Sequence, residues 1–198
     1  MTARESHVVE LVSLDGVAIG SDTVLAAHQA PGRLHRAFSV FLRDPSDGRV
    51  LLQQRAAVKT RFPLRWANTC CGHPRPGEDV ADAARRRLAE ELNLPAMPLT
   101  QVGVYTYRAE DPSSGRVEHE YDHVLLGDLP AGIRPTPDPD EVADLRWVSV
   151  PDLFTEITAD PNPFAPWLLG VTARLSPVSS AGLVADVTAD APERSGGR

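Results

Sequence analysis

The segment of residues 79–92 carries the clearest periodic pattern in the chain. Val80, Ala84, Leu88 and Leu92 recur there every four residues, so they form one apolar face of an α-helix. Segments rich in β-forming residues precede and follow it. The chain is therefore expected to fold around one long helix set among strands, which leaves few fold classes open to it.

Strand patterns lie on both sides of this helix. The predicted strands are residues 7–12, 17–19, 34–42, 50–54, 101–109, 117–126 and 145–150. Turn signals at Asp15-Gly16 and at residues 44–48 predict two hairpins before the helix, and residues 111–115 predict one after it. Two short helices are expected within residues 151–175. This order of elements predicts an α+β domain, in a layered α/β arrangement.

Length and composition indicate a single domain. With 198 residues, of which 42% are hydrophobic and 24% charged, the chain has the size and core of one globular domain, expected over residues 1–175. From Ser176 onward it has no aromatic residue and ends in Ser-Gly-Gly-Arg. Such a stretch buries too little surface to offset its ordering entropy. Residues 176–198 are therefore predicted to be a disordered tail.

The charge balance argues against nucleic acid as a partner. The chain has 27 acidic and 20 basic residues, a net charge of -7, and no long basic run that could follow a phosphate backbone. Any anionic ligand is then held by a few placed cations or by a metal.

The terminal and cysteine patterns point to a location inside the cell. No apolar stretch approaches the length of a membrane span, and residues 1–6 lack the apolar core of a secretory signal. Cys70 and Cys71 are adjacent, which makes a disulfide between them geometrically unfavourable. Two free thiols are typical of a reducing compartment. We therefore expect a cytoplasmic protein with no membrane partner.

The most informative window runs from residue 68 through the predicted helix to residue 94. Within it, six residues resemble the box of the Nudix family: Gly72, Glu78, Arg86, Leu88, Glu90 and Glu91. The resemblance implies a Nudix-like mixed sheet flanked by helices, whose loop and helix present carboxylates to a metal bound to diphosphate. Magnesium suits such hard oxygen ligands.

Two positions depart from the Nudix box and argue against ordinary Nudix hydrolysis. Arg87 stands where a Glu is usual, and Asn93 stands where a Gly is usual near the end of the helix. Arg87 and Glu91 lie four residues apart on one helix face, so one can bind phosphate while the other reaches its metal. The alternative for this pair, as for Arg86 and Glu90, is a solvated salt bridge.

A wider set of residues, in order along the chain, resembles the type 1 isopentenyl-diphosphate isomerases, which have a Nudix fold. The matching residues are Ala26-Ala27-His28, Arg33-Leu34-His35, Arg55, Lys59, Trp66-Ala67-Asn68, Cys71-Gly72-His73, Glu91, Tyr107, Glu118-His119-Glu120 and Pro166-Trp167. They cover nearly the whole chain through Leu175. An ordered set of this kind is much more specific than a single box.

The resemblance implies two metal sites. One divalent ion, either Mn²⁺, Zn²⁺ or Mg²⁺, is bound by five side chains, namely His28, His35, His73, Glu118 and Glu120. A further Mg²⁺ arrives with the substrate diphosphate and is held by Glu91. Residues two apart in a strand share a face, which independently pairs Glu118 with Glu120. The alternative is that these two acids and Asp122 form a solvent-facing strand surface, and structural roles are expected for His7, His119 and His123.

The same resemblance assigns the chemistry and the substrate. Cys71 and Glu120 transfer protons, with Tyr107 beside Glu120, and which of the two protonates the substrate is left open. Trp167 faces the positive charge that develops on carbon, unless it is a packed core residue. The substrate, a small isoprenoid diphosphate, is bound by three cations, which are Arg55, Lys59 and Arg87. The family often has a further Lys where this chain has Val24.

Two other functions remain possible at this stage. A Nudix hydrolase could use the same helix to activate water, although Arg87 argues against it. A noncatalytic diphosphate-binding domain would need the cations and Glu91 but no reactive thiol. The sequence leaves open the oligomeric state, the physiological metal and the favoured direction of isomerisation.

Overall fold

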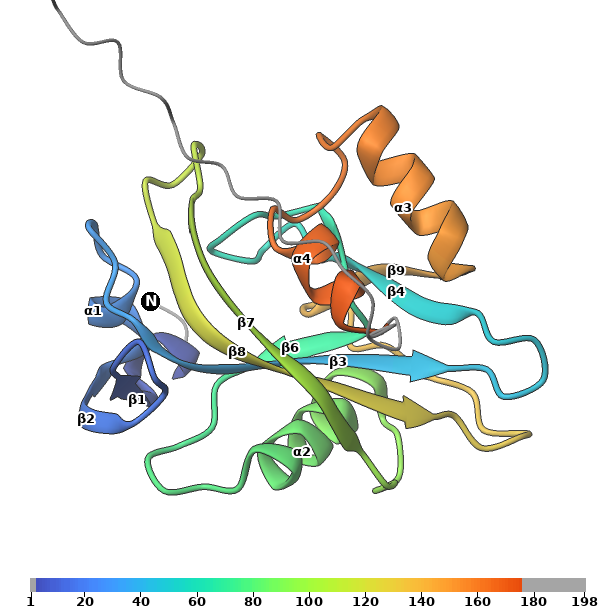
Figure 1. Cartoon of the computed structure of the whole chain (residues 1–198), viewed down its shortest axis with the longest axis horizontal. Helices are drawn as coiled ribbons and strands as arrows, with labels where there is room; N and C mark the ends of the chain where they lie inside the picture. The colour runs from blue at the N-terminus through green and yellow to red at the C-terminus, as the bar shows by residue number, and fades with distance from the viewer. Residues whose placement is uncertain (1–2, 176–198) are drawn as a thin grey trace, which may run out of the picture.

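The computed structural model describes residues 3–175, and the predicted tail at residues 176–198 lies outside the described residues (Figure 1). The strands are β1 (Val8–Val12), β2 (Ala18–Thr23), β3 (His35–Arg43), β4 (Val50–Arg55), β5 (Trp66–Ala67), β6 (Cys70–Gly72), β7 (Thr100–Glu110), β8 (Val117–Asp128) and β9 (Val142–Val148). The helices are η1 (Ala3–Ser6), α1 (Val24–Ala27), α2 (Val80–Leu92), α3 (Val150–Ala159), α4 (Leu168–Thr172) and η2 (Ala173–Leu175).

The strands form a mixed sheet centred on β3. Along its whole length β3 pairs in parallel with β8, from His35 opposite Glu120 to Arg43 opposite Asp128. Its other neighbours, β1, β4 and β6, are antiparallel to it, and β7 extends the sheet beyond β8. The predicted α+β fold with a mixed sheet and flanking helices is therefore confirmed.

The predicted long helix is α2, and its local sequence explains both of its ends. The side chain of Asp79 accepts a hydrogen bond from the backbone N–H of Asp82 at 3.0 Å, which caps the start of the helix. Asn93 ends it in the left-handed conformation, with φ of 52°. Asn93 thus occupies a position that often requires Gly, which explains this departure from the Nudix box.

Two hydrophobic clusters lie on opposite faces of the sheet. On one face, Phe38 and Leu42 of β3 pack with Leu88 and Leu92 of α2. On the other face, Phe41 of β3 packs in a cluster with residues of α3 and α4. Figure 1 shows α2 on one side of the sheet and α3 and α4 on the other. The alternation along β3 follows the two-residue period of a strand.

Most predicted elements are confirmed, and one hairpin is partly wrong. The pairs β1 with β2 and β7 with β8 form as expected, and α3 and α4 are the two predicted short helices. However, β3 and β4 pair only at Arg43 and Val50. Further along, the edges of β3 are taken by β8 and β6, so β4 diverges and pairs with β9 and β5. No helix within residues 3–175 is both long enough and apolar enough to cross a membrane.

Candidate active site and metal centre

A cavity of about 590 Å³ opens beside the ends of β3 and β8. Most of the predicted site residues line it: Arg55, Lys59, Cys71, His73, Arg87, Tyr107, Glu118, Glu120 and Trp167. His28, His35 and Glu91, which complete the predicted set, are buried close behind the wall. The structure thus brings together residues that lie up to 139 positions apart in the sequence, between His28 and Trp167.

Five of these residues converge on one point. His28, His35, His73, Glu118 and Glu120 present one nitrogen or oxygen atom each, and these atoms all lie within 4.8 Å of one another. The parallel register of β3 and β8 sets His35 opposite Glu120. Glu118 and Glu120 share a face of β8 as predicted, while His28 follows α1 and His73 follows β6.

The backbone orients two of the imidazole rings. Nδ1 of His28 lies 2.7 Å from the carbonyl oxygen of Val24, and Nδ1 of His35 lies 2.7 Å from that of Arg33. Because a carbonyl oxygen can only accept, Nδ1 carries a proton in each ring. In the neutral ring, Nε2 is then the atom with a free lone pair, and it points toward the carboxylates.

The contacts at the centre of the cluster fit a bound cation. Nε2 of His28 lies 2.8 Å from Oε2 of Glu118, and Nε2 of His73 lies 2.8 Å from Oε1 of Glu120. In His28, whose Nδ1 carries the ring proton, a neutral Nε2 and the ionised carboxylate of Glu118 both accept, so this pair is not satisfied at this distance without a shared proton or a metal. Nε2 of His35 is buried, with no hydrogen-bond partner among the described residues. The donor set therefore fits a divalent metal with mixed imidazole and carboxylate ligands.

Electrostatics hold these groups in the forms that bind a metal. Burial, together with His35 and His28, lowers the pKa of His73 to about 4, against the opposing effect of Glu120. Burial and Glu118 act to raise the pKa of Glu120, but the nearby rings of His35 and His73 bring it to about 2. At neutral pH, His73 is thus neutral and Glu120 ionised, which is what a divalent ion requires of its ligands.

The predicted proton-transfer residues line the same cavity. Tyr107 donates a hydrogen bond through its hydroxyl to Oε2 of Glu120 at 2.6 Å. The thiol of Cys71 lies 3.7 Å from Nη1 of Arg55. Burial raises the pKa of Cys71, partly offset by Arg55, and burial with Glu120 raises that of Tyr107. Both groups therefore carry a proton at neutral pH, whereas Glu120 does not.

The two adjacent cysteines have different surroundings, because successive side chains of a strand point to opposite faces. Cys70 is fully buried in the cluster beneath α2, and burial raises its pKa to about 12. Cys71 lies on the other face of β6, against the cavity. No disulfide joins them.

Trp167 is both a packed residue and part of the cavity wall. Its side chain is only 2% exposed, and its indole N–H donates to Oδ1 of Asn68 at 3.1 Å. The ring stacks on Tyr107 at 5.8 Å between centroids and receives the Arg55 guanidinium at 5.5 Å from its centroid. The ring face thus already binds a cation in this structure.

A buried network of opposite charges also borders the cavity. Arg87 contacts Glu91 and lies 3.4 Å from Glu141, while Lys59 contacts Glu141 and lies 3.9 Å from Glu91. Burial and Arg55 lower the pKa of Lys59 to about 8, against the effect of Glu141. Arg87 and Glu91 are buried, so the solvated alternative for this pair is wrong. The alternative of a solvated salt bridge agrees better with the partly exposed pair of Arg86 and Glu90.

The structure also corrects the alternative interpretation of the acidic strand. Glu118, Glu120 and Asp122 are all buried, so they do not form a solvent-facing surface. Asp122 accepts a hydrogen bond from the hydroxyl of Ser39 at 2.7 Å. Burial and Glu120 raise its pKa well above the usual value.

Three further charged residues of the cavity were not predicted from the sequence. Glu5, Arg61 and Glu141 all line the cavity and form ion pairs with site residues or with one another. They lie in loops or in η1, where no periodicity marks a buried position. Of the remaining histidines, His7 lines the cavity, whereas His119 faces the carbonyl of Gly32 and His123 faces Gln101.

Comparisons with known proteins agree on one family. A model described as the NUDIX domain matches residues 33–168. The chain is 60% identical over 163 residues to an isopentenyl-diphosphate Delta-isomerase of Nocardia farcinica, covering 82% of this chain and 91% of that protein. It is 48% identical over 167 residues to a protein of the same name from Streptomyces coelicolor, covering 84% and 82%.

Solved structures share the fold at low sequence identity. A crystal structure of a Deinococcus radiodurans protein superposes with a TM-score of 0.68 at 21% identity, covering 85% of this chain and 98% of that one. A MutT NUDIX hydrolase from Burkholderia pseudomallei gives a TM-score of 0.55 at 23% identity, covering 72% and 98%. These similarities establish the architecture of the sheet and helices. Because one fold can carry several activities, the activity has to be inferred from the residues of the site.

Proposed function

This chain belongs to the isopentenyl-diphosphate Delta-isomerases of the Nudix family, and we infer that it converts isopentenyl diphosphate into dimethylallyl diphosphate. The enzyme adds a proton to the terminal alkene carbon and removes one from the carbon on the other side of the tertiary centre. Positive charge develops on the tertiary carbon between these steps. No phosphorus–oxygen bond is broken.

One observation supports this reaction over the alternatives. One cavity is lined by a protonated thiol, a Tyr–Glu pair and a group of cations. The thiol and the Tyr–Glu pair suit proton transfer to and from carbon, while the cations suit the diphosphate. A diphosphate-binding domain without catalysis needs only the cations.

We assign the proton transfers to Cys71 and Glu120. The buried thiol of Cys71 holds its proton at neutral pH, and the ionised carboxylate of Glu120 is able to accept one. Tyr107 donates to Glu120 and orients the carboxylate toward the cavity. In the direction that forms dimethylallyl diphosphate, these states favour Cys71 as the acid and Glu120 as the base.

We assign the metal centre to His28, His35, His73, Glu118 and Glu120, with Mn²⁺, Zn²⁺ or Mg²⁺ as its ion. A divalent ion held there would stabilise the ionised form of Glu120 and restrict the orientation of its carboxylate. The tautomers set by Val24 and Arg33 leave Nε2 of His28 and His35 available for this.

We assign the diphosphate to Arg55, Lys59 and Arg87, with Glu91 holding the Mg²⁺ that accompanies the substrate. All three cations line the cavity and lie close to the carboxylates of Glu91 and Glu141 or to Cys71. Guanidinium groups suit diphosphate oxygens because their donors form a planar fork. Val24 contributes no charge to the cavity wall.

Trp167 is assigned to the side of the cavity where positive charge develops. Its ring face already receives the guanidinium of Arg55, which supports an ability to stabilise a cation. A desolvated indole face contributes about 2 kcal/mol to such an interaction.

A direct assay distinguishes the isomerase from a Nudix hydrolase. Purified enzyme with Mg²⁺ and isopentenyl diphosphate is expected to form dimethylallyl diphosphate without releasing phosphate, because its acid–base groups act on carbon. Both diphosphates and inorganic phosphate are followed over the same time course. Phosphate release in step with substrate loss would support the hydrolase instead, and binding without turnover would support a noncatalytic domain.

A further inference from the structure

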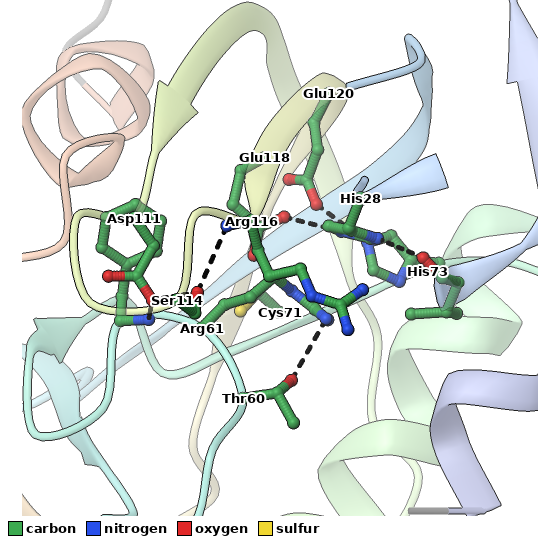
Figure 2. Close-up of polar contacts among 12 residues, drawn as sticks. His28, Thr60, Arg61, Cys71, His73, Asp111, Ser114, Arg116, Glu118 and Glu120 are labelled. Carbon is green, nitrogen blue, oxygen red and sulfur yellow. Dashed lines mark hydrogen bonds and ion pairs between the residues drawn. The ribbon is translucent and has the colours of Figure 1, made fainter. Parts of the chain in front are cut away.

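Arg61 lies in the loop between β4 and β5 and is held between two buried carboxylates. Its Nε donates to Oε1 of Glu118 at 2.9 Å, and its Nη1 donates to Oε1 of Glu5 at 2.9 Å. The side chain is 11% exposed. Figure 2 shows the Arg61 side chain beside Glu118, next to the residues of the metal centre.

Through this contact, Arg61 holds Glu118, which we assign as a ligand of the metal. The other oxygen of this carboxylate, Oε2, lies 2.8 Å from Nε2 of His28. Glu118 is thus held from one side by Arg61 and directed by its second oxygen toward the imidazoles. If the guanidinium were removed, Oε1 would lose a charged partner in a buried position, and the carboxylate would be free to turn.

The backbone of Arg61 holds Arg55, the cation that lies beside the thiol of Cys71. Its carbonyl oxygen accepts hydrogen bonds from Nη2 of Arg55 at 2.8 Å and from Nε at 3.2 Å. The remaining nitrogen of Arg55, Nη1, lies 3.7 Å from the sulfur of Cys71. One residue therefore contacts both a metal ligand and the cation beside the thiol.

The loop adopts an unusual backbone at this point. Phe62 and Leu64 have φ of 45° and 60°, in the left-handed region that side chains other than Gly rarely adopt. Such backbone persists where surrounding contacts determine it. The backbone N–H of Phe62 donates to Oδ2 of Asp111 at 3.1 Å, and the side chain of Arg61 is anchored at Glu118 and Glu5.

Glu5 completes the arrangement from the N-terminal side. Its Oε1 also accepts from the hydroxyl of Thr60 at 3.1 Å, and its Oε2 lies 4.0 Å from Arg116. The charge of Arg61 is thus balanced by one carboxylate outside the metal centre and one inside it. Because the contact of Arg61 with Glu5 is separate from its contact with Glu118, a substitution at Glu5 can weaken the first contact and leave the second in place.

We propose that Arg61 is a positioning residue of this isomerase, which orients Glu118 for the metal and Arg55 beside Cys71. The proposal rests on the metal centre assigned above. Loss of a residue that orients a metal ligand lowers metal affinity by about 10- to 100-fold. Because Arg61 does not itself bind the diphosphate in this scheme, its loss lowers kcat more than it raises KM.

The test compares Mn²⁺ affinity and steady-state kinetics of the full chain across four variants. Arg61→Met should bind Mn²⁺ about 10- to 100-fold more weakly than the unaltered chain. Arg61→Lys should be intermediate, because one ammonium retains the charge but cannot reach both carboxylates in the same geometry. Arg65→Met is the matched control, since no hydrogen bond or ion pair of its side chain is found among residues 3–175, and its affinity should be unchanged.

Glu5→Gln separates the positioning role from a purely structural one. It weakens the outer contact of Arg61 and leaves the contact with Glu118, so its Mn²⁺ affinity should stay closer to that of the unaltered chain. Equal losses in Glu5→Gln and Arg61→Met would overturn the proposal, as would an affinity of Arg61→Met within twofold of the unaltered chain. If Arg61→Met does not fold, the comparison of Arg61→Lys with Glu5→Gln decides by the same criterion. An unaltered chain that binds none of Mn²⁺, Zn²⁺ and Mg²⁺ would overturn the metal centre and this proposal together. The isomerisation assay tests the proposed function independently of both.

Discussion

Replacing Cys71 by alanine is expected to remove nearly all turnover while the protein stays folded. Cys71 is the thiol that faces the cavity, and burial keeps it protonated at neutral pH. Removal of a general acid or base typically lowers a rate by about 10²- to 10⁴-fold. The loss should appear in kcat, because the cations assigned to the diphosphate are unchanged. Steady-state kinetics with isopentenyl diphosphate, combined with thermal unfolding, measures both effects.

Cys70→Ala is the matched control for this substitution. Cys70 is the neighbouring thiol, yet it packs in the core beneath α2 on the opposite face of β6. Its replacement should lower the free energy of unfolding and leave substantial activity. Equal loss of activity in the two variants, with both folded, would reject Cys71 as the proton-transfer thiol.

Replacing His73 by glutamine is expected to give the second large effect, on metal affinity. His73 presents Nε2 to the cluster, 2.8 Å from Oε1 of Glu120, and its pKa near 4 keeps the ring neutral at pH 7. Loss of a direct ligand should lower the metal affinity by more than the roughly 10- to 100-fold expected when one outer contact is lost. Metal content after dialysis should fall, as should activity at limiting metal, and a chelator should inactivate the unaltered enzyme reversibly.

His119→Gln provides the control on the same strand. His119 lies between Glu118 and Glu120 in β8, but its ring faces the carbonyl of Gly32 instead of the cluster. Its metal content and turnover should match those of the unaltered enzyme. Unchanged metal stoichiometry in His73→Gln would exclude the five-residue centre.

The elements with a periodic pattern of apolar residues could be predicted from the sequence. The four-residue period of α2 and the alternation of β7 and β8 reflect burial of one face, which a sequence displays directly. The same alternation placed Glu118 with Glu120. These predictions depend only on neighbours within one element.

Contacts between distant elements could not be predicted in the same way. His35 meets Glu120 because β3 and β8 pair in parallel, and no local pattern specifies that pairing. For the same reason β4 was expected to pair along β3, whereas β6 and β8 occupy those edges. The roles of the metal-centre residues came from resemblance to a family, while the geometry that supports those roles came from the structure.

Charged residues in loops were the least predictable part of the site. Arg61 and Glu141 resemble ordinary solvated charges in the sequence, but each lies against the cavity in ion pairs with site residues. Asp122 would face solvent in the alternative interpretation of the acidic strand, but it is buried. Burial of a charge depends on its partners, and those partners come from other parts of the chain.

The most direct test of the isomerase follows solvent deuterium into the product. In heavy water, the thiol of Cys71 exchanges its proton for deuterium, so protonation at carbon should give dimethylallyl diphosphate with one deuterium in a methyl group at early times. Mass spectrometry and phosphate analysis of one reaction report the label and any cleavage together. The predicted result is a deuterated isomer without stoichiometric phosphate. Phosphate release without any isomer would contradict the central claim, and an isomer without label would contradict proton transfer from an exchangeable group.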